Sequence, residues 1–533
     1  MKRELLGVFW AYLFLISCNS KHFSRTSEEP ATLLRGMGAL RHPMATKSPE
    51  AQEFFDQGLT FIYAYNFAEA VHSFRRAAQL DPHSPMPYWG MALAESPNYN
   101  SWHMAPVREN RMREALEQAE ERSANASESE RAYIGALAQS MVEDGGRLYS
   151  NAMRELSRRY PDDPDAATLY AGALMNLHPW KLWNLDGSPG EDTQEICSVL
   201  ESVLKRWPLH VGANHLYIHT LEGSPFPERA SPSAHRLETL VPAAGHLVHM
   251  PAHIYFRTGD YAAAVKSSLA AVAADRAYAQ NRTIVNSPYV MGYMAHNAYF
   301  LAYAANMDGE FGTAYRAAKE LEPSTHSQAF KTALILVLLR FGHWGELVAQ
   351  PEPEMRLNGV VFFWHYARGC GFAQKGDLKR AVDERAAMEE VYGQIPPGRA
   401  FGMFFNDWST LHDLALNALD ARIAAAQHWD ECAIRCWRRG IAVQDNMNFD
   451  DLPDWYYPLR ESLGAQLFRC GRFAEAEQVF RDDLARTPRN PRSLFGLWKT
   501  LEAEKQETDA SWVRQQFEAA WKGAGDALRL EDF

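Results

Sequence analysis

The stretch FFDQGLTFIYAYNFAEAVHSFRRAAQLDP, residues 54–82, predicts the fold of the chain. Its small and aromatic residues stand at a regular spacing: Gly58, Ala70, Phe74, Ala77 and Pro82. A glycine on one helix and an alanine on the next allow two antiparallel helices to approach closely. The phenylalanine fills the gap between them, and the proline ends the unit. We therefore expect a helical hairpin here.

The same pattern returns later in the chain, in LGAQLFRCGRFAEAEQVFRDDLARTP, residues 463–488. The matching residues are Gly464, Ala476, Phe480 and Pro488. Gly369 and Ala381 keep the glycine-to-alanine interval, and the turns TGDYAAA, DGEFGTA and KGDLKRA mark further corners between helices. This spacing resembles the tetratricopeptide repeat. The resemblance implies an all-α solenoid of helical hairpins, roughly eight to ten of them, over residues 46–533.

Four further strings resemble those of a group of long bacterial tetratricopeptide-repeat proteins: YWGMALAESPN, LMNLHPW, ANHLYIHTLEGSP and GHLVHMPAHIY. This resemblance supports the fold and implies no activity. Tetratricopeptide proteins commonly grip peptides or other proteins on the concave wall made by the first helix of each hairpin.

Composition limits the class of protein. The chain has 533 residues, more than one compact core normally holds. Its hydrophobic fraction of 47% and charged fraction of 23% are typical of a folded protein. The net charge of -12 argues against a nucleic-acid partner, because a nucleic-acid-binding surface needs clustered lysine and arginine.

The first residues resemble a lipoprotein signal. Lys2 and Arg3 precede an apolar run, residues 5–16, that is too short to span a bilayer. The run ends in LISC, which resembles the lipobox of bacterial lipoproteins. That resemblance implies a signal peptide at residues 1–17, lipidation of Cys18 and a tether at residues 18–45. An uncleaved membrane anchor is the alternative.

Asn19 follows the cysteine, and a non-acidic residue there resembles signals for the outer membrane. We therefore expect a protein of the bacterial cell envelope, anchored to the membrane through lipid at Cys18 and facing the periplasm.

Histidines gather in residues 210–300. In the tetratricopeptide resemblance, side chains 18, 15 and 11 residues before the corner alanine face the groove. The corner alanines are Ala230, Ala264 and Ala314. Counted back from them, the groove positions include His215, His219, His246, His249, His253 and His296. Three consecutive hairpins would thus share one histidine cluster.

Helix geometry supports the cluster independently. At 100° per residue, His215, His219 and Glu222 fall within about 60° of one another, and so do the three histidines from His246 to His253. Neutral imidazole is a common ligand of copper, zinc and iron. Pro251 lies between His249 and His253, and a helix that begins at this proline leaves His246 and His249 in the preceding turn. In that case the angle of 100° per residue does not apply to this trio.

Two hypotheses follow. The first is a metalloprotein holding one or two transition-metal ions, with Glu222 as the carboxylate ligand or base. It would be a metal-dependent oxidoreductase or hydrolase acting on a small molecule. Histidine-only ligation of two ions would favour copper, and ligation by Glu222 would favour zinc or iron. The second is a scaffold that grips a partner protein or peptide in the groove without catalysis. The groove histidines could also be purely structural.

Residues at the open edge of the groove are candidates for binding a substrate. They come from two apolar helices that each break into asparagine, proline and an aromatic residue: Asn98, Tyr99, Asn176, His178 and Trp180. The alternative is that they cap loops and pack as ordinary aromatics. No zinc-protease helix, phosphate loop or serine nucleophile elbow is present in the sequence.

Overall fold

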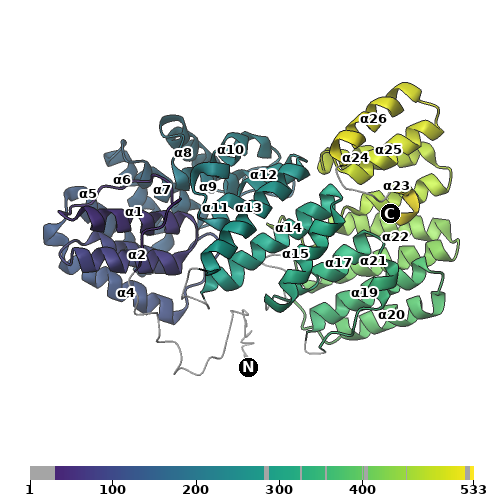
Figure 1. The fold of residues 1–533 in the computed structure, drawn as a ribbon, viewed down its shortest axis with the longest axis horizontal. Coiled ribbons are helices and arrows are strands. Elements are labelled where there is room, and N and C mark those ends of the chain that lie inside the picture. Colours follow the sequence, from purple (N-terminus) through teal and green to yellow (C-terminus); the bar gives the residue numbers. More distant parts are fainter. Residues whose placement is uncertain are drawn as a thin grey trace, which may run out of the picture.

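The computed structural model describes residues 31–280, 287–324, 327–354, 357–398, 400, 406–451, 453–521 and 528–533. Regular structure in these ranges is helical, with only isolated β-bridges. The helices pair into antiparallel hairpins that follow one another along the long axis of the molecule (Figure 1). The all-α solenoid of helical hairpins is therefore confirmed.

The N-terminal half carries ten α-helices in the described residues. They are α1 (Pro49–Tyr63), α2 (Phe67–Leu80), α3 (Met86–Glu95), α4 (Pro106–Glu121), α5 (Glu128–Ala138), α6 (Gly145–Arg159), α7 (Pro164–Met175), α8 (Thr193–Arg206), α9 (Val211–Leu221) and α10 (Ser231–Leu240). Short 3-10 turns lie between some of them: η1 (Ser123–Asn125), η2 (Gln139–Met141) and η3 (Pro227–Ala230).

The remaining described elements continue the array. They are α11 (Gly245–His249), α12 (Pro251–Arg257), α13 (Tyr261–Gln280), the π-helix η4 (Tyr289–Tyr293), α14 (Met294–Asp308), α15 (Phe311–Ser324), α16 (Gln328–Lys331), α17 (Ala333–Arg340), α18 (Trp344–Val348), α19 (Asn358–Gln374), α20 (Leu378–Tyr392), α21 (Trp408–Ala426), α22 (Asp430–Gln444), α23 (Leu459–Arg469), α24 (Phe473–Arg486), α25 (Pro491–Ala503), α26 (Glu507–Ala520) and η5 (Leu530–Asp532). These helices make more hairpins than the repeat spacing suggested, because several middle hairpins are built from short or broken helices that do not keep the spacing.

The glycine–phenylalanine contact predicted from the sequence is present. The ring of Phe74 on α2 lies between Gly58 and Gly90, where a Cβ atom would come within 2.6 Å of it. Phe480 is held in the same way by Gly464 and Gly496. The aromatic ring thus fills the space between three helices, and only hydrogen fits opposite it.

The corners of eight hairpins in the described residues pass through the left-handed backbone region. Glycine holds this position in five corners: Gly259, Gly309, Gly342, Gly376 and Gly471. Tyr65, His428 and Lys505 adopt the same conformation at the equivalent corners, with φ of 55°, 60° and 62°. Side chains with a Cβ rarely adopt this conformation, because it brings the Cβ close to the backbone.

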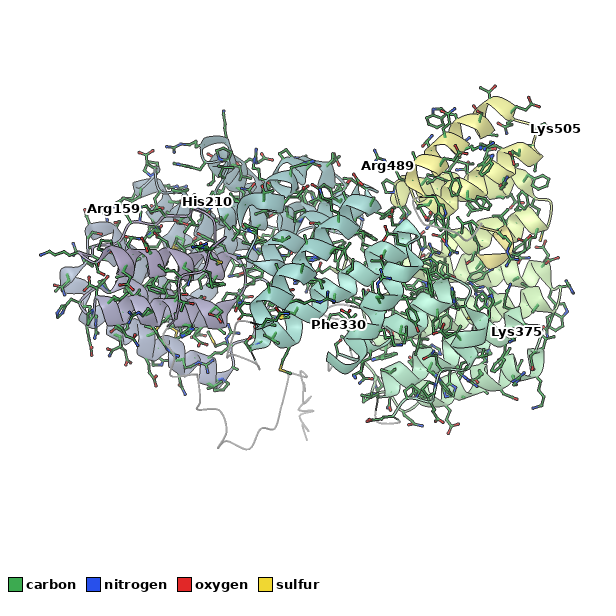
Figure 2. The ribbon with its side chains drawn as sticks, viewed as in Figure 1. Arg159, His210, Phe330, Lys375, Arg489 and Lys505 are labelled. Carbon is green, nitrogen blue, oxygen red and sulfur yellow. The ribbon has the colours of Figure 1, made fainter. Side chains whose placement is uncertain are left out.

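The N-terminal hairpins curve until α1 meets α9. Gly212 on α9 lies so close to the ring of Tyr63 on α1 that an added Cβ atom would be 2.3 Å from it. His210, at the start of α9, lies among these N-terminal hairpins, and Lys505 lies at the tip of the last hairpin (Figure 2). The curvature brings the corner after α1 next to helices that follow it by some 150 residues.

Part of the segment assigned to the tether lies against the N-terminal hairpins. Backbone Ala243 N–H donates to Gly36 O at 3.1 Å, and the ring of His42 is 2.9 Å from Asp165. Met44 is buried. Residues 31–45 are therefore packed on the solenoid. The signal peptide, Cys18 and the rest of the expected tether lie outside the described residues, and among the described helices none is long and apolar enough to cross a membrane.

The connection between α22 and α23 runs along the inner wall. Its backbone accepts hydrogen bonds from α14, from Tyr303 to Trp455 O at 3.3 Å and from Asn306 to Tyr456 O at 3.4 Å. The hydroxyl of Tyr456 lies 3.1 Å from that of Tyr366 on α19. Both α14 and α19 are first helices of their hairpins, so the chain itself occupies part of the wall expected to be an open groove.

Candidate metal centre

The six predicted histidines converge in two groups. The groups are site A, His215, His219 and His246, and site B, His249, His253 and His296. Within each group one ligand atom from each residue lies within 4.8 Å of the others. All six side chains are buried. The expected cluster is thus present, but it is enclosed in the protein, whereas the sequence analysis placed it on an open concave wall.

Four helices supply these side chains. His215 and His219 lie one turn apart on α9, His246 and His249 lie on α11, and the other two come from α12 and α14. The break expected at Pro251 separates α11 from α12. Met250 keeps helical dihedral angles across the break, so all three histidines of this segment remain on one side.

The ring nitrogens approach one another closely. In site A, His246 Nε2 lies 3.2 Å from His215 Nε2. In site B, His249 Nε2 lies 2.8 Å from His253 Nε2 and 3.1 Å from His296 Nε2. Two nitrogens bound to one tetrahedral ion at the usual metal–nitrogen distance stand about 3.3 Å apart. The spacing is therefore close to that of ligands that share an ion.

Acceptors outside the groups fix the direction of three rings. His215 Nδ1 lies 2.6 Å from the backbone oxygen of Tyr63. Glu222, at the C-terminal end of α9, accepts from His219 Nδ1 at 2.6 Å and from His253 Nδ1 at 2.5 Å. A proton held on Nδ1 leaves the Nε2 lone pair free to bind a metal. Glu222 therefore acts as a partner of two histidines, with one oxygen for each group.

A second carboxylate, Asp451, was missed by the sequence analysis. It comes from the connection between α22 and α23, and its oxygens lie 2.9 Å from His253 Nδ1 and 3.4 Å from His296 Nε2. Its side chain is 4% exposed, so its charge is held inside the protein. No local signal marks it, because it stands about 150 residues after His296, the last histidine of the two groups, in a loop without repeat spacing.

A buried layer behind the histidines holds α11 and α14. Backbone His246 N–H donates to Tyr289 Oη at 3.0 Å, and Tyr289 donates to Asp275 at 2.9 Å. Asn297, next to His296, donates to the other oxygen of Asp275 at 2.7 Å. Burial raises the pKa of Asp275 to about 6. This carboxyl group thus connects the backbones that carry one histidine of each site.

Burial also keeps most of the imidazoles neutral. It lowers the pKa of His215, His246, His249 and His296, and the neighbouring histidines lower it further in the first three. His253 is different. Burial opposes its charge, but Asp451 and Glu222 outweigh burial and raise its pKa to about 10. The two carboxylates therefore require a cation between them, and a proton on His253 supplies it when no metal is bound.

Four ring nitrogens of the six histidines have no hydrogen-bond partner among the described residues: His219 Nε2 and the Nδ1 atoms of His246, His249 and His296. Buried polar atoms are normally paired, and unpaired ones need an explanation. An imidazole nitrogen is either a donor or an acceptor, so His249 Nε2 cannot satisfy both of its neighbours at once. An ion in each site would bind the Nε2 lone pairs together, including that of His219.

Each site has its own aromatic ring, which lies against all three of its histidines. In site A the ring of Tyr65 has centroid distances of 4.6, 6.0 and 5.4 Å to His215, His219 and His246. In site B, Phe300 lies 4.7, 4.8 and 6.3 Å from His249, His253 and His296. Neither aromatic residue was predicted for the site. The signal for Tyr65 would have been its place at a hairpin corner where other units have glycine.

The predicted substrate-binding residues divide into two groups. Tyr99 and Trp180 lie beside site A, with ring centroids 5.6 and 5.8 Å from His219. Asn98 caps its own turn by accepting from Asn100 N–H, and Asn176 donates to Pro97 O at 3.2 Å. His178 pairs with Asp192 at 2.9 Å. Only the two aromatic residues therefore touch the histidines.

Comparisons with known proteins do not assign a family. No family model matches the chain, and no curated protein matches it in sequence. Among solved structures, one described as "Crystal structure of APC/C hetero-tetramer Cut9-Hcn1" is similar, with 11% identity and a TM-score of 0.30 over 85% of this chain and 90% of that chain. At that score the likeness carries no argument. The fold rests on the hairpins themselves, and the site rests on its own geometry.

Proposed function

We propose that the protein is a metalloprotein whose sites A and B each hold one copper ion. The observation that carries this proposal is the role of Glu222. Both of its oxygens accept from histidine Nδ1 atoms, so the Nε2 atoms of those histidines face the sites, and Asp451 lies at the edge of site B, 3.4 Å from His296 Nε2. Among the metals that imidazole binds, two ions held by three histidines each favour copper over zinc or iron.

The charge balance supports a cation here. Glu222 and Asp451 are buried, and histidines are their ion-pair partners. Neutral imidazoles add no charge of their own, so a metal ion would offset the carboxylates and remove the need for a proton on His253. Without an ion, His219 Nε2 stays unpaired, and His249 Nε2 cannot pair with both His253 and His296.

The arrangement favours a reaction with a small ligand. The two groups are adjacent, with ring centroids 5.9 Å apart for His219 and His253 and 6.1 Å apart for His246 and His249. Two copper ions held by the six histidines would supply two one-electron redox centres side by side, where dioxygen and a small organic electron donor could both react. We therefore propose a copper-dependent oxidoreductase acting on a small molecule.

The alternative is a scaffold for a partner protein, which the hairpin fold itself favours. Against it stands the connection between α22 and α23, which occupies the wall of α14 and α19 where a peptide would lie. We also propose the cell-envelope location predicted from residues 1–18. Release of the protein from membranes on Cys18→Ala substitution would support it, and retention would oppose it.

The test of the metal proposal is elemental mass spectrometry on the purified chain. It would be incubated separately with copper, zinc and iron and then desalted, beside a His219→Ala, His249→Ala double variant. We expect two copper ions per chain and none in the double variant. A chain that stays metal-free with all three metals would reject the proposal. Tight binding of zinc or iron, with no binding of copper, would show that the proposed metal is wrong.

A further inference from the structure

Tyr65 covers site A from an unusual backbone position. Its ring contacts all three histidines of the site and is nearly parallel to the ring of His246, at an interplanar angle of 21°. The residue lies at the corner between α1 and α2, with φ of 55°. Five other hairpins place glycine at this corner, among them Gly259 and Gly471.

The backbone conformation is costly for a tyrosine. A bulky side chain at positive φ is a genuine outlier, and such residues concentrate where the structure uses them. The ring is therefore held over the three histidines of site A as a wall.

The two rings that cover the sites are not equivalent. Phe300 lies on α14, one turn after His296, and is 1% exposed, whereas Tyr65 lies in a turn and is 7% exposed. Other aromatic rings stand around the same histidines: Tyr99, Trp180 and Tyr293. Of these rings, Tyr65 contacts all three histidines of site A, and it is more exposed than Phe300 in site B.

We propose that Tyr65 is a specificity-determining residue that limits the external ligand of site A to molecules of two or three atoms, such as dioxygen. This inference rests on the proposed function, since it needs a metal in site A. Glycine at this corner would keep the backbone turn and remove the wall. A ligand with a ring would then reach the metal.

The experiment compares azide and imidazole as probes of the copper-loaded full chain. Binding would be followed by the azide-to-copper absorption band, and imidazole by its competition with azide. The variants are Tyr65→Gly, Tyr65→Asn and Tyr65→Phe. The matched control is His428→Gly, which makes the same change at an exposed corner far from the histidines in the sequence, where φ is 60°.

We expect imidazole to bind at least about tenfold more tightly to Tyr65→Gly than to the parent, with azide affinity changed by less than about threefold. Tyr65→Asn, whose side chain tolerates positive φ, should show the same change if the glycine variant is too unstable to purify. Tyr65→Phe and His428→Gly should behave as the parent.

The experiment separates a failure of the proposed function from a failure of this inference. A parent chain that takes up no metal rejects the proposed function and this inference with it. Copper-loaded Tyr65→Gly and Tyr65→Asn proteins that keep the parent's preference for azide over imidazole reject the inference alone.

Discussion

Glu222 joins the two histidine groups through its two oxygens, one 2.6 Å from Nδ1 of His219 in site A and the other 2.5 Å from Nδ1 of His253 in site B. Both contacts are buried. One carboxylate thus sets the direction of a ring in each site, and the sites should respond together when it is changed.

Glu222→Gln should weaken metal binding at both sites. A glutamine can accept from one Nδ1–H through its oxygen, but its amide N–H groups then face the other ring. Loss of such a partner typically costs about 10–100-fold in metal affinity. Competition with a chelator of known affinity measures the effect. The control is Glu201→Gln on α8, where the carboxylate pairs with Arg229 at the surface and should not affect metal. Unchanged affinity in Glu222→Gln would contradict the assigned role.

Asp451→Asn should affect site B and spare site A. Asp451 contacts only histidines of site B, at 2.9 Å from His253 and 3.4 Å from His296. We expect the second copper ion to be lost at about tenfold lower chelator concentration, while the first is retained. Asp413→Asn is the matched control, because it alters an exposed aspartate 3.2 Å from a histidine, His412, that belongs to neither site. Equal weakening of both ions would argue against the separate role of this loop.

Gly245→Ala should destabilise the protein and disturb site A. An added Cβ atom would stand 2.1 Å from Asp275 Oδ1, so the carboxylate that holds Tyr289 and through it His246 must move. Overpacking of this kind typically costs about 1–3 kcal/mol. Gly135→Ala is the control, because nothing lies within 4 Å of its Cβ position and the residue is exposed on α5. That change should be neutral or stabilise by about 0.5 kcal/mol. Thermal unfolding and copper content measure both effects.

His42→Ala should loosen the segment of residues 31–45. Its ring is 5% exposed and pairs with Asp165, which also accepts from Tyr63 and His210. Removing one partner of a buried ion pair typically lowers the free energy of unfolding by about 3 kcal/mol or more. We expect a loss near the lower end of that range, because Asp165 keeps its two other partners. His235→Ala, at an exposed histidine on α10, should change the melting temperature little.

The His42 contribution also depends on pH. Burial opposes the charge on His42, but the hydrogen bond and charge of Asp165 outweigh it and raise its pKa. A raised folded-state pKa gives stability that is complete below the unfolded value of about 6.5 and is lost as pH rises through the folded value. The difference in melting temperature between parent and His42→Ala should therefore shrink as pH rises above about 6.5. A constant or growing difference would contradict this assignment.

The hairpin fold could be predicted because its causes are local. The spacing from Gly58 to Phe74 decides how closely two neighbouring helices pack, and the contact is made within one hairpin and the next. The sequence also predicted that the six histidines lie near one another, because the corner alanine sets the register of each first helix, but it did not predict their division into two groups. The period of a helix and the register between neighbouring helices are set by residues that are close together in the sequence.

The tertiary structure alone decided what surrounds the histidines. Asp451 reaches site B from a loop far along the chain, and Tyr65 reaches site A because the N-terminal hairpins curve until α1 meets α9. It also decided that Glu222 faces two Nδ1 atoms, which turns the Nε2 atoms of His219 and His253 toward the sites. Such contacts depend on small rotations between hairpins that add up along the solenoid, and no single stretch of sequence contains their sum.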